Sequence, residues 1–488
     1  MAHNKTDCLL SNEVEHMAKS YGVIVIGAGS GGLTAAATAK GFFQSVALIE
    51  GRKTGGECTH YGCMPSKALI NYAEMVHTAS KVTGEAPKND SKKALEYVRT
   101  AINNIYQHET PEVLGKSYDV YEGYAKFLDA HTVEVNGEQL TGKKIIISTG
   151  SSPMIPTFIK GIENVDYLTN ENIFYQEKLP DSLIALGGGP IGVELCQALN
   201  RIGIKVTVVE MMPRILPREE EKYSQMITEA LEKEGMVICT GAKATEVRQE
   251  NGVVTLTVEK DGKVQEISAG GILMSLGRTP NLDRLDLDAA GILYTRRGIK
   301  VDENLETTAK GVYAVGDVVG PYQFSHMANY QGILAGQNAV APFNIRKVDY
   351  THKITWTTFT DPELARCGLT EDEAKEQFGE ENVRVYYESY EYLERAETKL
   401  GSIGEVKLVL DGKGKILGAT VIGDRAGEII SEIQVLKTLG LNTAKLANVL
   451  HPYPTYAEIL VKFGKRVQID NIFRLPVVKQ VMAIVNGK

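Results

Sequence analysis

The chain has 488 residues, which is more than one ordinary hydrophobic core accommodates and predicts roughly three domains. Hydrophobic residues make up 43% and charged residues 23%, as in ordinary globular proteins, and the net charge of −8 argues against nucleic-acid binding. The sequence shows no apolar run long enough for a membrane span and no signal-peptide pattern at its start, so we expect a cytoplasmic protein without a membrane partner.

The first predicted elements form a dinucleotide-binding βαβ unit. An apolar strand, Val23 to Ile26, leads into a GxGxxG motif, a helical stretch and a second strand that ends in Glu50. The motif glycines are Gly27, Gly29 and Gly32. Such glycines let the backbone approach a pyrophosphate at a helix N-terminus, and the terminal acid accepts a ribose hydroxyl. Taken alone, the motif is also compatible with a glycine-rich turn in another α/β domain.

A close cysteine pair follows in GGECTHYGCMPSK, Gly55 to Lys67. Six cysteines in a chain of this size do not form a disulfide framework, so the pair indicates redox or metal chemistry. The spacing of Cys58 and Cys63 permits a disulfide if the backbone curls where a helix begins, and Pro65 fits only a first helical turn. The helix N-terminus and Lys67 both favour a thiolate. A metal site is the alternative, but the sequence offers no further ligands, and we expect no metal.

A second copy of the βαβ plan lies in SLIALGGGPIGVELCQALNRIGIKVTVVE and ends in Glu210. Its motif glycines are Gly187, Gly189 and Gly192. In both copies the acid lies 23 positions after the first glycine (27 to 50 and 187 to 210), and each copy ends in an apolar strand that runs into a glycine, Gly150 or Gly277. This internal duplication predicts two cofactors held against one another, a flavin and a nicotinamide.

The acid of the second copy bears on the choice of nicotinamide. Glu210 favours NADH over NADPH, because a carboxylate accepts a free 2′-hydroxyl and repels a 2′-phosphate. Arg214 and Arg218 are near enough in sequence to reach a 2′-phosphate. We prefer the alternative that both are solvated charges beside the acidic run that begins at Glu219.

Two further patterns complete the chain. A strand, Val312 to Val315, runs into Asp317, where an acid can meet a sugar-like hydroxyl, although an ordinary turn aspartate is the alternative. From about residue 346 the sequence alternates strands with amphipathic helices, which predicts an α+β layer.

Together these motifs closely resemble the FAD-dependent pyridine nucleotide-disulfide oxidoreductases, the family of dihydrolipoamide dehydrogenase, glutathione reductase and mercuric reductase. The likeness covers nearly everything after about residue 20 and includes GVYAVGDV as the second flavin motif and TFTDPELARCGLTE as the opening of the dimerisation domain. It implies an α/β fold with two Rossmann-like domains, the NAD domain inserted in the FAD domain, and a C-terminal α+β dimerisation domain. The expected boundaries are a polar extension at 1–19, the FAD domain at 20–152 and 280–345, the NAD(P) domain at 153–279 and the interface domain at 346–488.

The resemblance also implies roles for individual residues. Cys63 would lie against a tightly bound FAD, and Cys58 would exchange with the substrate. Asp317 would bind the ribitol of the flavin, and Lys67 would pair with Glu194 near the flavin ring. Electrons would then pass from NADH through FAD and the Cys58–Cys63 disulfide to a small-molecule acceptor.

The segment HPYPTYAEI departs from the family pattern. Members that reduce disulfides carry His-Pro-Thr-x-x-Glu. The histidine of this motif is supplied by the partner subunit and acts as the acid–base catalyst. Aligned on Pro454 and Glu458, this chain has Tyr453 in place of that histidine. A phenol has a pKa of about 10 and an imidazole about 6.5, so the phenol is a poor base at neutral pH. We expect an obligate homodimer in which Tyr453 and Glu458 reach the partner's Cys58.

The acceptor therefore stays open at this point. We expect a soft acceptor, as in mercuric reductases, or an unorthodox disulfide or persulfide, although the tail lacks the further cysteine pair usual in mercuric reductases. Dihydrolipoamide dehydrogenase is the first alternative, with His451, His60 or His326 as the base, each of which also has an ordinary structural interpretation. A non-catalytic flavoprotein redox sensor or scaffold is the second. The remaining cysteines are interpreted as packing residues: Cys8, Cys196, Cys239 and Cys367.

Overall fold

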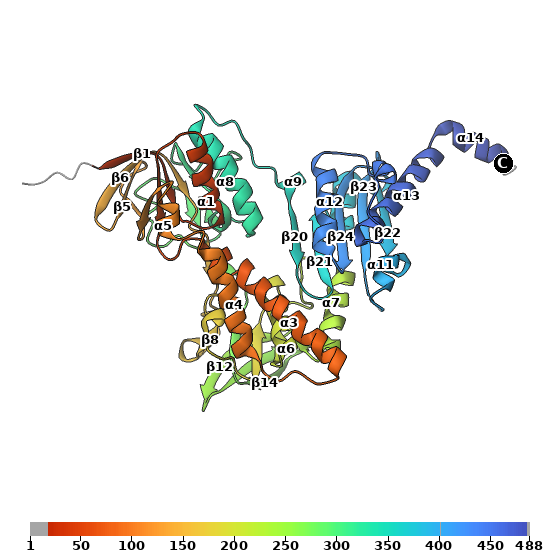
Figure 1. The fold of residues 1–488 in the computed structure, drawn as a ribbon, viewed down its shortest axis with the longest axis horizontal. Helices are drawn as coiled ribbons and strands as arrows, with labels where there is room; N and C mark the ends of the chain where they lie inside the picture. Colours follow the sequence, from red (N-terminus) through yellow and green to blue (C-terminus); the bar gives the residue numbers. More distant parts are fainter. Residues whose placement is uncertain (1–17, 401, 486–488) are drawn as a thin grey trace, which may run out of the picture. The chain divides into compact units, whose positions relative to one another are not determined.

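The computed structural model describes residues 18–400 and 402–485. Cys8 and nearly all of the expected N-terminal extension lie outside these residues. The described chain forms two compact units (Figure 1). The first contains the described residues up to Cys58, Tyr106–Ser151 and Pro280–Val348; the second contains Thr59–Ile105, Ser152–Thr279 and the described residues from Asp349 onward. Neither unit is therefore continuous in sequence.

A seven-stranded sheet forms the centre of the first unit. Its order is β3 (Asp119–Glu122), β2 (Val46–Glu50), β1 (Lys19–Ile26), β6 (Glu138–Ile147), β5 (Thr132–Val135) and β4 (Lys126–Phe127), with β19 (Val312–Ala314) also paired to β6. Strand β1 runs parallel to both neighbours, with Val23 opposite Val46 and Lys144. Its apolar run is buried, as expected for a parallel strand covered on both faces.

Helices α1 (Ser30–Gly41) and α8 (Ser325–Val340) pack side by side on this sheet (Figure 1). Small residues permit the close approach: a Cβ on Gly332 would lie 2.4 Å from the carbonyl oxygen of Gly31. The N-terminus of α1 is thereby fixed at the carboxyl end of β1.

The second unit contains a second parallel sheet. Its order is β11 (Val237–Cys239), β10 (Lys205–Val209), β9 (Ser182–Leu186), β15 (Ile272–Met274) and β8 (Tyr167–Leu168). Helix α6 (Pro190–Arg201) follows β9, and α7 (Glu221–Lys233) precedes β11. Helix α3 (Cys63–Thr83) packs on α6 through a shared apolar core. An antiparallel ribbon of β12 (Lys243–Glu250), β13 (Val253–Lys260) and β14 (Lys263–Ala269) completes this region.

The same unit also carries a five-stranded antiparallel sheet. Its order is β20 (Thr355–Thr358), β21 (Glu363–Gly368), β24 (Ile416–Gly423), β23 (Glu405–Asp411) and β22 (Val383–Ser389). Helix α12 (Ala426–Thr438) packs on this sheet, and α13 (Ile459–Phe473) packs along β22. The strands predicted after residue 346 are present, and the stretches GEVKLVLD and KILGATVIG contain β23 and β24. The α/β fold class with a C-terminal α+β layer is confirmed.

Two features are absent from the described ranges, a membrane span and a metal-binding cluster. None of the helices within residues 18–400 and 402–485 is both long and apolar enough to cross a bilayer. In the same part of the chain, no group of three or more His, Cys, Asp or Glu side chains is placed to hold a metal ion.

Candidate functional site

The first glycines of the two motifs have the same backbone geometry. Gly27 has φ +104° and Gly187 has φ +103°. A Cβ would lie 2.2 Å from the Ser148 carbonyl oxygen in the first case and 2.5 Å from the Ser275 carbonyl oxygen in the second. Only glycine accommodates both the left-handed conformation and the close contact. The duplication seen in the sequence is thus also a duplication of backbone conformation.

The second glycines stand at the N-termini of helices and face open space. Gly29 precedes α1, and Gly189 precedes α6. A Cβ on Gly189 would meet no atom within 4 Å, and one on Gly29 would first meet the Cα of Gly56 at 3.7 Å. Free space in front of unsatisfied helical N–H groups suits a pyrophosphate. The third glycines pack closely, because a Cβ on Gly32 or Gly192 would strike the carbonyl oxygen of its own motif's first glycine.

The first terminal acid is held by main-chain donors. The carboxylate of Glu50 accepts hydrogen bonds from the Ala28 N–H at 2.7 Å and the Arg52 N–H at 2.7 Å. Burial raises the pKa of Glu50, and these two hydrogen bonds oppose the rise. The carboxylate is therefore oriented by the turn itself.

Glu210 repeats this arrangement in the second unit. It accepts hydrogen bonds from the Gly188 N–H at 2.7 Å and the Met212 N–H at 2.8 Å. The two donors stand in the same sequence relation to Glu210 as Ala28 and Arg52 do to Glu50. Both acids therefore end a parallel strand beside an open glycine loop, which is the arrangement that ribose recognition requires.

Arg214 and Arg218, which we expected to be solvated charges, differ in their surroundings. Glu219 is buried, and its carboxylate accepts a hydrogen bond of 2.7 Å from the indole N–H of Trp356. Arg214 is half-buried, and its guanidinium donates to the carbonyl oxygen of Glu219 at 3.3 Å. Arg218 is exposed, as expected. The expectation of a solvated charge is therefore wrong for Arg214, whose guanidinium lies against the main chain of its own segment.

Asp317 and the two strand-ending glycines occupy turns. Asp317 lies in a short 3-10 turn after β19 and accepts a hydrogen bond of 2.6 Å from the Ser151 hydroxyl. Gly150 has φ +68° and Gly277 has φ +124°. An acidic side chain held by a hydroxyl can also accept a polyol hydroxyl, which is compatible with a flavin ribitol.

The two cysteines lie where helices begin. Cys58 is in the short helix α2 (Gly56–His60), and Cys63 is the first residue of α3. Both residues are half-buried, and Pro65 is buried in the first turn of α3. The predicted helix start after GGECTHYG is therefore present.

Lys67 and Glu194 are paired, although they are far apart in sequence. The ammonium of Lys67 lies 2.5 Å from Glu194 Oε2 and 4.2 Å from the centroid of the Phe359 ring. The other oxygen of Glu194 accepts a hydrogen bond of 2.8 Å from the Phe359 N–H. Phe359 thus contacts both members of the pair, Lys67 through its ring and Glu194 through its N–H. The sequence pattern did not predict Phe359 as a residue of this site.

The residues of the segment HPYPTYAEI differ from one another in exposure and in hydrogen bonding. Tyr453 is 69% exposed, whereas His451 is tied within the chain. The Nε2 of His451 lies 3.0 Å from a Glu432 carboxylate oxygen, and its Nδ1 lies 3.3 Å from the Val449 carbonyl oxygen. Both ring nitrogens therefore lie against oxygen atoms of the chain itself. Glu458 Oε2 is buried without a hydrogen-bond partner among the described residues.

The other two candidate histidines have different surroundings. His60 is only 1% exposed, and its ring lies 5.8 Å from that of Tyr61. His326 is exposed in the first turn of α8, and its ring stacks on Phe324 at 5.3 Å. Of these two histidines, only His326 is exposed.

Two of the remaining cysteines are packing residues, as predicted. Cys196 and Cys367 are fully buried, and burial raises the pKa of each thiol to about 12. Cys239 is half-buried in β11. A buried thiol with so high a pKa has almost no reactive thiolate at neutral pH.

Known protein families agree with the geometry of the two glycine motifs and the cysteine pair. The model of the pyridine nucleotide-disulphide oxidoreductases matches residues 21–332, and the model of their dimerisation domain matches residues 354–463. The chain belongs to this family. The expected family and enzyme class are confirmed: the protein is a flavoprotein disulfide oxidoreductase that depends on FAD and a pyridine nucleotide, and its dimerisation domain supports a homodimer. The alternative of a non-catalytic scaffold is thereby disfavoured.

Relatives within this oxidoreductase family carry different names. The chain is 34% identical to a dihydrolipoyl dehydrogenase of Thermus scotoductus, over 91% of this chain and 96% of that protein. It is also 34% identical to a mercuric reductase of Bacillus cereus, over 94% of this chain and 72% of that protein. A structure of RclA from Escherichia coli, a HOCl-induced flavoprotein disulfide reductase in complex with Cu(II), aligns with a TM-score of 0.81 and 26% identity over 92% of this chain and all of that one. Because the chain is equally identical to relatives with two different activities, sequence identity does not indicate the electron acceptor.

Proposed function

We propose that the enzyme oxidises NADH and passes the electrons to a soft acceptor, such as mercuric ion, a persulfide or an unorthodox disulfide. The arrangement around His451 and Tyr453 carries this proposal. The exposed position that corresponds to the family's catalytic histidine holds a phenol, and both nitrogens of the imidazole two residues earlier lie against oxygen atoms of the chain itself. An acceptor that binds thiolates directly does not need a histidine base, so this site favours it over lipoamide.

The proposed site divides into three groups of residues. The flavin site comprises Gly27, Gly29, Gly32, Glu50, Lys67, Gly150 and Asp317. The nicotinamide site comprises Gly187, Gly189, Gly192, Glu210 and Gly277. The catalytic group comprises Cys58, Cys63, Lys67, Glu194, Tyr453 and Glu458. We also propose the four-part domain division given above, with the nicotinamide domain inserted in the flavin domain.

The open loop before α1 and the oriented carboxylate of Glu50 fit the adenosine half of FAD. When bound, FAD supplies hydride acceptance from the nicotinamide and delivery of an electron pair to a disulfide. The chain's own residues then perform four tasks. Glu210 accepts the adenosine ribose hydroxyls of NADH, Lys67 and Glu194 hold a fixed charge pair, Cys63 and Cys58 carry the electron pair as a dithiol, and the Cys58 thiolate binds the acceptor.

The preference for NADH rests on the geometry of Glu210. Its two oxygens are fixed by the N–H groups of Gly188 and Met212, so the carboxylate has no freedom to turn away from a 2′-phosphate. A fixed negative charge favours the free hydroxyl of NADH.

Dihydrolipoamide dehydrogenase is the second candidate. The relative from Thermus scotoductus with this name aligns over almost its whole length, and NADH use is compatible with it. In that case a base other than the family's histidine must act.

The deciding experiment is the initial rate of NADH oxidation by the purified holoenzyme with several acceptors at neutral pH. Lipoamide, mercuric ion with excess thiol, and a low-molecular-weight persulfide are compared at equal enzyme concentration. We expect turnover with mercuric ion or the persulfide and a negligible rate with lipoamide while the flavin spectrum is intact. Fast lipoamide reduction, with neither soft acceptor reduced, contradicts the proposal and favours the second candidate.

A further inference from the structure

Residues 211–220, here called the post-Glu210 segment, connect the proposed ribose acid to helix α7. The first part of the segment is fixed on its own domain: the Met212 N–H donates to Glu210, and the Leu216 N–H donates to the Gly188 carbonyl oxygen at 2.8 Å. The last three residues are held by side chains from a different sheet, the antiparallel sheet of the dimerisation domain.

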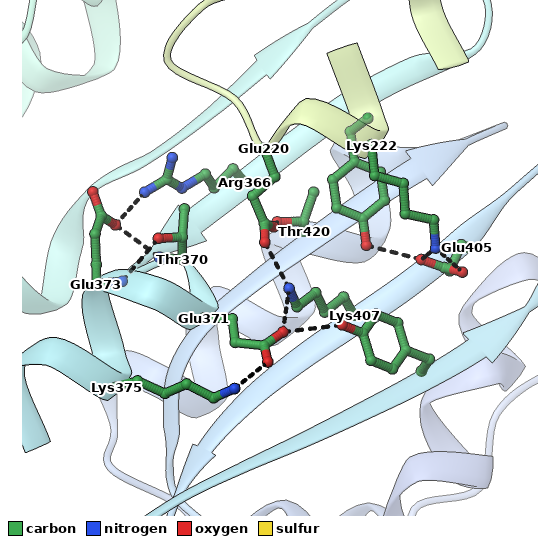
Figure 2. Close-up of polar contacts among 12 residues, drawn as sticks. Glu220, Lys222, Arg366, Thr370, Glu371, Glu373, Lys375, Glu405, Lys407 and Thr420 are labelled. Carbon is green, nitrogen blue, oxygen red and sulfur yellow. Dashed lines mark hydrogen bonds and ion pairs between the residues drawn. The ribbon is translucent and has the colours of Figure 1, made fainter. Parts of the chain in front are cut away.

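Lys407 of β23 makes the central contact (Figure 2). This lysine is only 4% exposed, and its ammonium lies 2.6 Å from Glu220 Oε1 and 2.8 Å from Glu371 Oε2. Thr420 of β24 donates to the second oxygen of Glu220 at 3.3 Å. Lys375 lies 2.7 Å from Glu371 and does not contact Glu220 in Figure 2, so the cluster contains two lysines of which one reaches the segment.

Two more side chains hold the neighbouring residues. Arg366 of β21 is buried and donates to the Arg218 carbonyl oxygen at 3.0 Å. Its other terminal nitrogen donates to Glu373 at 2.6 Å. Trp356 of β20 donates to the Glu219 carboxylate, and the Arg366 guanidinium lies 5.0 Å from the Trp356 ring centroid. Residues 218, 219 and 220 therefore each receive a donor from the antiparallel sheet.

Lys407 carries its positive charge between two carboxylates. Burial lowers the pKa of Lys407, but hydrogen bonds to Glu220 and Glu371 outweigh this effect and raise it above the usual lysine value. The lysine is thus charged at neutral pH, and removing it leaves Glu220 half-buried without its ammonium partner. Such charge-assisted hydrogen bonds also fix geometry, because the donor and acceptor must remain aligned.

We propose that Lys407, Arg366 and Trp356 are positioning residues, through which the dimerisation domain holds the post-Glu210 segment and sets the affinity for the adenosine half of NADH. The inference rests on the proposed role of Glu210 in binding ribose. It predicts that the cluster acts on nucleotide binding and leaves the subsequent hydride transfer unchanged. A purely structural cluster would alter stability without this separation.

The test is anaerobic single-turnover reduction of the holoenzyme by NADH, followed through the loss of flavin absorbance. Lys407→Met is compared with Lys375→Met, a matched control that removes the other lysine from Glu371 but leaves Glu220 untouched. We expect the half-saturating NADH concentration to rise about ten-fold in Lys407→Met, as for the loss of a charge-assisted hydrogen bond, with an unchanged limiting rate. Lys375→Met should match the wild type in both quantities.

Trp356→Phe keeps an aromatic ring, although a smaller one, and removes the donor to Glu219. It replaces Lys407→Met as the deciding variant if the latter does not retain flavin. It should also raise the half-saturating concentration at an unchanged limiting rate. Wild-type half-saturation in every variant that retains flavin overturns the inference, as does a change confined to the limiting rate.

Glu210→Gln in the same assay distinguishes a failure of the proposed positioning role from a failure of the proposed ribose contact. If Glu210→Gln weakens NADH binding and Lys407→Met and Trp356→Phe do not, only the positioning role fails. If Glu210→Gln binds NADH like the wild type, the proposed ribose contact itself fails.

Discussion

Replacing Tyr453 by histidine should give the enzyme the base that its relatives use on disulfide substrates. Tyr453 is largely exposed, so the smaller imidazole fits without disturbing the core. Glu458, which the family pattern places five positions later, keeps a buried carboxylate oxygen without a partner among the described residues. An imidazole at position 453 therefore has a carboxylate available in the family's own motif.

The size of the effect follows from the absence of any other base in this segment. Both nitrogens of His451 are engaged by oxygen atoms of the chain, so we expect little general-base contribution from it in the wild type. General acid–base catalysis contributes about 10²- to 10⁴-fold. Taking the lower end, because the rest of the motif is not optimised for lipoamide, we expect kcat/KM for lipoamide to rise about 100-fold. This factor corresponds to about 2.7 kcal/mol of barrier height.

The assay is steady-state NADH oxidation with lipoamide as acceptor, using wild type, Tyr453→His and Tyr453→Phe with equal flavin content. Tyr453→Phe is the matched control, because it changes the hydroxyl but not the ring, and its lipoamide rate should equal that of the wild type. The reasoning is refuted if Tyr453→His gives no gain. It is also refuted if Tyr453→Phe loses an already fast lipoamide rate, because the hydroxyl would then be the base.

Three further outcomes are expected. Cys63→Ser should bind FAD normally but lose the long-wavelength absorption that a thiolate beside a flavin gives on reduction with NADH; a persisting band would reassign the thiol roles. Glu210→Ala should lower the NADH-to-NADPH ratio of kcat/KM by about ten-fold, as for the loss of a charged hydrogen-bond acceptor, and an unchanged ratio would remove Glu210 from nucleotide selection. Arg201→Met should lower the free energy of unfolding by about 3 kcal/mol in urea titrations, because Arg201 is buried between Glu234 at 2.5 Å and Asp361 at 2.7 Å. The exposed bidentate pair of Arg248 is its control: Arg248→Met should leave the urea midpoint nearly unchanged, and equal losses would refute the burial argument.

The parts of the site that the sequence predicted well depend on local backbone chemistry. Gly27 and Gly187 have to be glycines because of their own conformation and the strand beside them, so a short pattern reveals them. The acids Glu50 and Glu210 are likewise fixed by N–H groups close in sequence. The start of α3 at Cys63 agrees with the proline two residues later.

The parts that sequence reasoning missed depend on contacts between distant segments. Lys407 alternates with Val406 and Leu408 in a strand, a pattern typical of a solvent-facing lysine on a half-buried sheet. It is buried because the segment around Glu220 covers that face. The burial of Glu219 was likewise not predicted, because its donor Trp356 is distant in sequence. The Lys67–Glu194 pair came from the family resemblance, because residues 127 positions apart leave no spacing signal.

The position of Trp356 gives the enzyme a built-in optical probe. The chain contains one tryptophan, and its indole N–H donates to Glu219 at the end of the segment that follows Glu210. Tryptophan emission from the whole homodimer therefore originates at two equivalent junctions between the nucleotide-binding region and the dimerisation domain. Any step of turnover that moves this junction can be followed by fluorescence without a label, a mutation or knowledge of the physiological acceptor.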